Sequence, residues 1–454
     1  MSLTGDAGPA AVRELPGSVD TIVPVSTRRA ALLAALVLGA ALAVVIAVRT
    51  PWSLLPAPPG GRTQPDPTGG LPAAYLSRAA GFAAALRPAS AAGMLLGLLV
   101  SALFGLTRLG SRLVTALGRP VRGRWARLRW VEQVVATVAV LVVLGQVVLL
   151  PLSIWAEVVL HRYGVSTEGW GLWVRDLAVS TAFTVGGTAL VVLLLVGLAR
   201  RAPRTWWMWA AGLAAGLTVA GSFLWPVVLE PAFNSFTPMA AGPLRSDLLD
   251  LARRNGTPVD DVLVADASRR TTSLNAYVSG LGSTRRIVVY DTVLRQLPDD
   301  QIESIVAHEL GHVSADDVLT GTLMGALGAA AGVAALGWLL SWRPLLRRAG
   351  ADGPADPRVV PALLFVVAAA TLVATPVQDL VSRQLEARAD LHALDLARDP
   401  AAFTAMQERL AEASLAQPEP PRVWHLLFGN HPTEAERVAM ARDWARLTAG
   451  PGAR

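Results

Sequence analysis

The sequence predicts a mainly α-helical, polytopic membrane protein with about seven transmembrane helices and a domain of helices and a small antiparallel sheet at the membrane surface. Of its 454 residues, 53% are hydrophobic and only 16% are charged, whereas a soluble globular chain carries about 25% charged residues. Apolar runs of about twenty residues, long enough to cross a bilayer as helices, separate the polar segments. The chain has no cysteine, which excludes disulfides and thiolate metal ligands.

Seven apolar runs make up the predicted membrane part. The first follows a polar segment, residues 1–27, which is rich in Gly, Pro and Ala and is expected to be flexible. It is longer than the core of a signal peptide, so we expect an uncleaved span. Residues 28–229 then hold five transmembrane helices, and residues 318–380 hold two. The runs are 30–48, 89–107, 131–155, 176–199, 206–229, 318–341 and 359–380, with a Pro- and Gly-rich loop at 49–88.

Two polar segments, residues 230–317 and 381–454, do not resemble membrane spans. In the second, charged and apolar residues recur at helical spacing, interrupted by prolines. Each segment is joined to a span, so we expect the two to fold together into one domain at the membrane surface. The first contains the strand signals, at Val262–Val264, Leu274–Val278 and Arg286–Tyr290, with a turn around Gly280–Thr284 between the last two.

The first polar segment contains His308-Glu309-x-x-His312. On a helix, residues four apart lie on one face, so both imidazoles can bind one ion. Zinc binds neutral His nitrogens and keeps one of its four positions open in catalytic sites. Glu309 is placed to take a proton from the attacking water. The sequence therefore predicts a helix, begun by a capping box of Asp300 and Glu303, that supplies two ligands to one Zn²⁺ per chain.

The candidate third ligand is Glu386, just past the last apolar run. Two His and one Glu form a known catalytic zinc set. Asp390 follows one helical turn later on the same face, where it can accept the outer N–H of a ligand His. On spacing alone, Glu386 is equally well interpreted as a solvated residue paired with Arg383, and both alternatives stay open here. The histidines that are not expected to bind metal are His161, His392 and His425.

With further motifs, the chain resembles the integral-membrane zinc metallopeptidases that include the type 1 CAAX prenyl protease and the bacterial heat-shock protease HtpX. The number and order of spans look like the seven-span CAAX prenyl protease type. The resemblance covers roughly residues 70–445, while the first 70 residues and the 343–358 loop carry no family motif. The motifs are His308-Glu309-x-x-His312, Ser382-Arg383-x-x-Glu386-x-x-Ala389-Asp390, Phe233-Asn234-x-Phe236-x-Pro238, Leu274-Asn275-Ala276-Tyr277-Val278-x-Gly280 and Asn430-His431-Pro432-x-x-x-x-Arg437.

The resemblance implies a zincin-like metalloprotease domain, a membrane-embedded zinc metalloendopeptidase activity on peptides or membrane proteins, and Glu386 as the third ligand. It does not extend to a prenylated substrate, because no residue reports on prenyl binding. The alternative is a non-catalytic membrane scaffold or transport-like protein with a structural zinc, which has no need of a base at Glu309.

Other motif residues have candidate roles around the zinc. Asn275, Ala276 and Tyr277 lie in a predicted edge strand that can pair with an extended substrate. His431 is a candidate donor to the developing oxyanion, so we group it with Glu309 and Asp390 as catalytic candidates. Arg437 either anchors its segment or binds substrate.

The charge distribution bears on partners and on orientation. The chain has 40 arginines, no lysine and a net charge of +6. The arginines cluster in short connections between spans, which is typical of the cytoplasmic side of a membrane protein rather than of a nucleic-acid surface. By that rule the polar domain would lie outside, whereas the resembled family places its sites toward the cytosol, so the sequence leaves the side open. The expected partners are the cell-membrane bilayer and a peptide or membrane-protein substrate, with no nucleic acid.

Overall fold

The computed structural model describes residues 25–118, 128–224, 228, 230–280, 282 and 285–449. Most of the expected flexible segment, up to residue 24, therefore lies outside the described residues, as do parts of the 206–229 run and of the turn at 280–284.

Seven helices of the described chain are long and apolar enough to cross a membrane, which confirms the predicted number and order of spans. Two of them, α2 (Ala73–Gly105) and α13 (Val360–Ala397), extend furthest beyond the apolar runs. The first of these begins at Ala73, inside the stretch expected to be a loop, because residues 73–87 are rich in the strong helix formers Ala and Leu. The other continues without a break from the last apolar run to Ala397. The seven are α1 (Val25–Arg49), α2 (Ala73–Gly105), α4 (Arg129–Tyr163), α5 (Trp170–Arg201), α6 (Trp206–Leu224), α11 (Asp317–Leu339) and α13 (Val360–Ala397).

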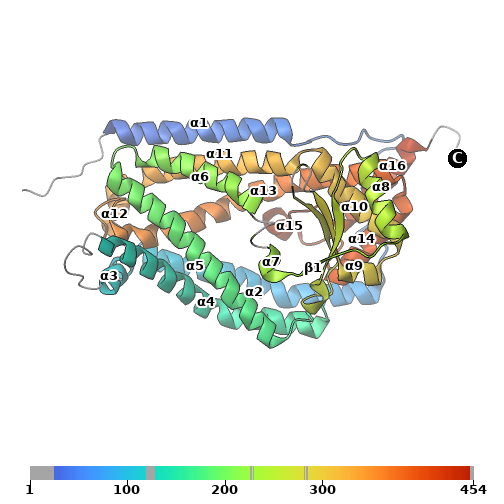
Figure 1. Cartoon of the computed structure of the whole chain (residues 1–454), viewed down its shortest axis with the longest axis horizontal. Coiled ribbons are helices and arrows are strands. Elements are labelled where there is room, and N and C mark those ends of the chain that lie inside the picture. The colour runs from blue at the N-terminus through green and yellow to red at the C-terminus, as the bar shows by residue number, and fades with distance from the viewer. Residues whose placement is uncertain are drawn as a thin grey trace, which may run out of the picture.

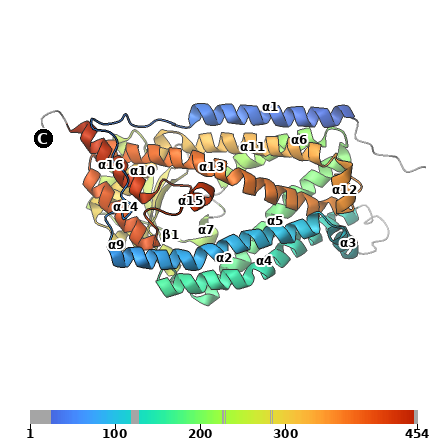
Figure 2. The same cartoon turned by 180° about the vertical axis from the view of Figure 1, so that it is seen from behind.

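These helices form two layers. Figure 1 shows α1, α6 and α11 along one side of the molecule and α2 and α4 along the other, while α5 and α13 run obliquely, α5 against α4 and α6 and α13 against α2. The layers converge at the short helices α3 (Arg108–Leu117) and α12 (Arg343–Ala349), and they are far apart at the opposite end, where the polar domain lies. The view from behind shows α7 (Glu230–Phe233) and α15 (Arg422–Phe428) between the two layers (Figure 2).

The polar domain contains a four-stranded sheet of order β1-β2-β4-β3. β3 and β4 pair antiparallel, as predicted, but β2 and β4 pair parallel, so the sheet is mixed rather than antiparallel. The chain passes from β2 to the far edge, forms β3, and returns as β4 into the position beside β2, which makes β2 and β4 run the same way. The strands are β1 (Phe236–Pro238), β2 (Asp261–Ala265), β3 (Ala276–Ser279) and β4 (Arg286–Tyr290).

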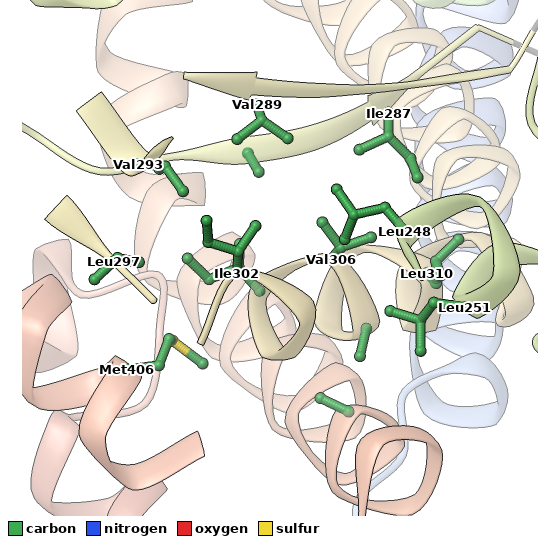
Figure 3. Close-up of a cluster of buried hydrophobic side chains, with 14 of the residues drawn as sticks. Leu248, Leu251, Ile287, Val289, Val293, Leu297, Ile302, Val306, Leu310 and Met406 are labelled. Atoms are coloured by element: carbon green, nitrogen blue, oxygen red, sulfur yellow. The ribbon is translucent and has the colours of Figure 1, made fainter. Parts of the chain in front are cut away.

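The helices of this domain come from both polar segments, and one of them, α10 (Asp299–Ser314), lies against the sheet. Ile302, Val306 and Leu310 are spaced four residues apart on α10, and they point toward β4 and α8 (Pro243–Arg254) (Figure 3). Each is at most 1% exposed, and burying such a side chain contributes about 1.5–3 kcal/mol. This core fixes the rotation of α10. The other helices are α8 (Pro243–Arg254), α9 (Asp291–Gln296), α14 (Pro400–Ser414) and α16 (Glu434–Thr448).

The start of α10 differs from the prediction. Pro298 is the N-cap residue, and no side chain caps the helix. Asp300 is therefore already inside the first turn, where its carboxylate accepts from the backbone N–H of Gln301 at 2.9 Å. The predicted capping box is wrong, because the proline begins the helix ahead of Asp300.

Glu434, the first residue of α16, is an unusual buried carboxylate. It is 8% exposed, and its two carboxylate oxygens have no hydrogen-bond partner among the described residues. Burial, with Glu408 and Glu412 nearby, raises the pKa of Glu434 to about 8. Because this folded-state pKa exceeds the unfolded one, stability is lost as pH rises from about 4.5 toward 8.

We therefore expect Glu434→Gln to raise the thermal unfolding midpoint at pH 8 by a few degrees, on the order of what 1–3 kcal/mol gives in a domain of this size. The difference should shrink as the pH falls toward 4.5 and vanish below about pH 3.5, where Glu434 is neutral in both states. Melting curves of the detergent-purified proteins across this pH range check this. Glu419→Gln, at an exposed position, is the control. A midpoint difference between Glu434→Gln and the wild type that does not change with pH would contradict the prediction.

Candidate metal and catalytic site

The three predicted metal ligands lie together where α10 meets α13. The Nε2 atoms of His308 and His312 are 3.2 Å apart. Glu386 Oε2 lies 3.2 Å from His308 Nε2, and Glu386 Oε1 lies 3.6 Å from His312 Nε2. The buried Oε2 has no hydrogen-bond donor of good geometry among the described residues. Two imidazoles and a carboxylate that converge in this way fit a zinc ion, which prefers such N and O donors.

A glycine between the two histidines allows this approach. A Cβ at Gly311 would lie 3.0 Å from the Cβ of His392 and 3.1 Å from the Cα of Ala389, closer than most real Cβ contacts. Any larger residue at this position would push α13 away from α10. The glycine in the motif is therefore needed to bring Glu386 within reach of the histidines.

The outer nitrogen of His308 meets a buried ion pair. Its Nδ1 lies 2.9 Å from Asp390 Oδ1. Asp390 is fully buried and accepts from Arg437 Nε at 2.7 Å and also from its Nη2. A carboxylate in this position holds the imidazole in one tautomer, with Nε2 free for a metal. Because Arg437 is engaged with Asp390, the geometry favours the anchoring alternative for Arg437 over substrate binding.

His312 has a corresponding pair that the sequence analysis missed. Its Nδ1 lies 2.8 Å from Asp317 Oδ2, and Asp317 also pairs with Arg388 of α13. Asp316 has a left-handed backbone, at φ 54°, which ends α10 and turns the chain into α11. This turn directs Asp317 back toward His312. The only sequence signal was an Asp-Asp pair shortly after the motif.

Glu309 lies between the two histidines in the chain and is partly buried. Burial raises the pKa of its carboxyl group, and the neighbouring His308 and His312 lower it. A carboxylate with a raised pKa is a stronger base at neutral pH, as a general base requires.

The strand predicted to receive substrate is at the edge of the sheet. β3 is the outermost strand beside β4, and it packs against α10. Asn275 is exposed just before it, and its carbonyl accepts from Tyr290 N at 3.0 Å. Ala276 is 1% exposed, so its side chain belongs to the core and only its backbone is available to a substrate. Tyr277 donates to Glu230 Oε2 at 3.4 Å.

His431 also lies at this site. Its Nε2 is 3.2 Å from Glu386 Oε2, and half of its side chain is exposed. Arg383, the alternative partner of Glu386, instead donates to the carbonyls of His425, at 3.2 Å, and of Gly429. Arg383 thereby ties the segment that carries His431 to α13.

The other three histidines, His161, His392 and His425, lie outside this donor group. The group of His308, His312 and Glu386 is the one that the described residues form at metal-binding distances. His161 Nδ1 contacts the carbonyl of Glu157 at 2.9 Å, and His392 Nε2 contacts Asn255 Oδ1 at 2.7 Å.

Comparisons with known proteins agree with this geometry. Residues 238–445 match the model of peptidase family M48, and residues 89–235 match the CAAX prenyl protease N-terminal region of five membrane helices. The uncharacterized metalloprotease YhfN of Bacillus subtilis is 31% identical over 323 residues, which cover 69% of this chain and 76% of that protein.

Similarity to CAAX prenyl proteases is more limited in extent. CAAX prenyl protease 1 of Saccharomyces cerevisiae is 30% identical over 203 residues, 44% of each protein. Its homolog in Oryza sativa is 30% identical over 181 residues, 39% of this chain and 42% of that protein. These matches thus span less than half of the relatives. The crystal structure of S. mikatae Ste24p superposes with a TM-score of 0.71 at 20% identity and covers 94% of this chain and 100% of that one, which shows a common fold. The chain therefore belongs to peptidase family M48, and it is a multi-pass membrane metallopeptidase that acts on peptide or protein substrates.

Proposed function

We propose that the protein is a zinc endopeptidase of the cell membrane that holds one Zn²⁺ between His308, His312 and Glu386. The observation that carries this proposal is the convergence of these three donors, within 4.8 Å of one another, with Glu309 next to His308 on the same helix. A zinc ion in such a set polarises the scissile carbonyl and acidifies water. A scaffold with a structural zinc would have no use for Glu309.

The protein's own residues then have distinct roles. Glu309 takes a proton from the attacking water and passes it to the leaving amine. Asp390 and Asp317 orient His308 and His312 through their Nδ1–H groups. His431, half exposed next to Glu386, donates to the oxyanion as its charge grows.

The sheet edge is the proposed substrate-binding element. The backbone of Ala276 and Tyr277 pairs with an extended peptide, and Asn275 contacts its polar groups. The exposed position of Asn275 and the edge position of β3 beside α10 support this. Since several relatives are named CAAX prenyl proteases, we propose that the substrates are peptides or membrane proteins with cleavable segments close to the bilayer.

The proposed domain organisation follows from the same contacts. A flexible segment, 1–27, precedes five transmembrane helices, 28–229. The parts 230–317 and 381–454 together form the peptidase domain, on either side of the last two spans, 318–380. The packing of α10 and α8 with Phe403, Met406 and Trp444 in one core supports the union of the two parts.

Metal removal tests this function. We expect the purified protein in lipid nanodiscs to cleave an unstructured fluorogenic peptide, to lose that activity with a chelator, and to regain it with Zn²⁺ but not with Mg²⁺, because imidazole ligands suit zinc. Elemental analysis of the same samples reports the zinc content. Cleavage that continues in protein shown to be metal-free would exclude the proposal.

A further inference from the structure

The spans can be followed one by one between two ends of the molecule. At the end of the peptidase domain, Thr63, just after α1, donates its N–H to Asp443 at 2.9 Å, and Tyr75 of α2 donates to the Ala411 carbonyl at 2.8 Å. There too, Thr167, between α4 and α5, donates its N–H to the Arg270 carbonyl at 3.0 Å. These contacts fix the peptidase-side ends of α1, α2, α4 and α5.

The opposite end is defined by contacts among the other helix termini. Arg28 of α1 lies over the ring of Trp338 at the end of α11, 5.9 Å from its centroid. Arg200 of α5 lies over Trp130 at the start of α4, at 5.3 Å, and donates to the Ala355 carbonyl at 3.1 Å. Figure 1 shows α3 and α12 at this same end.

This opposite end, which we call the arginine-rich end, carries a strong excess of positive charge. In the described residues its acids are Glu132, Asp352 and Asp356, and the last two pair with Arg358. No other arginine of this end forms an ion pair within the described part of the chain, and ten of them are exposed. The arginines are Arg28, Arg29, Arg108, Arg112, Arg129, Arg200, Arg201, Arg204, Arg343, Arg347, Arg348 and Arg358.

The short connections on the peptidase side carry a smaller excess. Residues 49–88 contain Arg49, Arg62, Arg78 and Arg87 against Asp66, and in residues 156–175 Arg162 and Arg175 are balanced by Glu157 and Glu168. The peptidase domain itself is too long to report on orientation, since the charge bias that sets topology is read from short loops near the span ends. Judged by these short connections, the arginine-rich end carries the larger positive charge.

We propose that the arginine-rich end is the cytoplasmic end of the protein, in contact with the anionic lipid headgroups of the inner leaflet. Arginines near such a surface are attracted to its anionic lipids, and the tryptophans beside Arg28 and Arg200 are typical of the lipid–water boundary. Each span crosses the membrane from the arginine-rich end to the opposite end. The peptidase domain, which lies at that opposite end, is therefore on the extracytoplasmic side. The proposed orientation adds to the proposed function. Only the conclusion that substrates are cleaved outside the cytoplasm rests on that function.

The absence of native cysteine makes a direct test available. Gly242 in the peptidase domain and Gly353 at the arginine-rich end each have open space around the position of a Cβ, so single Gly242→Cys and Gly353→Cys variants form a matched pair. Each is labelled with a membrane-impermeant maleimide in spheroplasts of a bacterial host and again after lysis. We expect Gly242→Cys to be labelled in both samples and Gly353→Cys only after lysis.

Labelling of Gly353→Cys in intact spheroplasts, alone or together with Gly242→Cys, would overturn the proposed orientation. If either variant fails to label after lysis, Glu419→Cys and Asp352→Cys, at exposed positions of the same two ends, give the same comparison. The labelling requires no peptidase activity. A wrong orientation can therefore be distinguished from a wrong proposed function.

A second arm tests the role of the arginines. Replacing Arg343, Arg347 and Arg348 together by Asn should make Gly353→Cys reactive in a measurable fraction of intact spheroplasts, because the charge bias is reduced. The matched control replaces Arg253, Arg254 and Arg409, exposed arginines of the peptidase domain, and should leave the pattern unchanged. Identical labelling of both triple variants would overturn the role assigned to the arginine-rich end.

Discussion

Glu309→Gln is expected to lower the kcat of peptide cleavage by about 10²–10⁴-fold, the typical contribution of a general base. The amide cannot accept the water proton, whereas the three donors on α10 and α13 remain in place. The bound zinc should therefore stay at the wild-type level. Steady-state cleavage of the fluorogenic peptide, with elemental analysis of the same preparation, measures both quantities.

The matched control is Glu303→Gln, a carboxylate on the same helix outside the donor group, which should keep its activity. Wild-type cleavage by Glu309→Gln would show that another group activates the water. The same variant also serves to find substrates, because uncleaved natural substrates should accumulate in membrane fractions that carry it.

Glu386→Ala is expected to release the metal. This change removes the one carboxylate among the three donors and leaves two imidazoles, a set too small for a stable zinc site. After dialysis against a chelating buffer that leaves the wild type loaded, the variant should contain almost no zinc and should not cleave the peptide. Zinc content by elemental analysis and affinity by competition with a chromogenic chelator provide the measurements.

Substitutions of residues next to the proposed ligands should lower zinc affinity to different extents. Asp317→Asn keeps the shape but loses the charge that faces His312, so zinc affinity should fall by about 10–100-fold. Arg383→Gln should retain wild-type affinity, since Arg383 bonds to backbone carbonyls and not to Glu386. A Glu386→Ala protein that still holds zinc as tightly as the wild type would mean that another residue completes the site.

Local spacing predicted the parts of the site that one helix carries. The spacing of His308, Glu309 and His312 along one helix predicts their arrangement without any knowledge of the fold. Glu386 was different, since its approach depends on α13 packing against α10 at Gly311, a contact between distant parts of the chain. There the family resemblance, rather than spacing, identified the candidate.

The features that sequence reasoning missed depend on non-local geometry. Asp317 turns toward His312 only because Asp316 adopts a left-handed backbone. The parallel pairing of β2 and β4 depends on where the returning strand is placed, which alternation of apolar residues does not report. Span number followed from composition, whereas helix ends did not, because alanine-rich flanks such as the start of α2 continue the helix beyond the apolar run.

The unbroken course of α13 has a mechanical consequence. The same helix that crosses the lipid carries Glu386, and Pro376, a residue at which helices bend, lies within it about 15 Å before Glu386. A change of about 10° in the bend at Pro376 would move Glu386 by about 2–3 Å relative to the membrane-crossing part of α13. Bilayers of different thickness change the tilt of such a helix, so we expect the catalytic rate to depend on bilayer thickness.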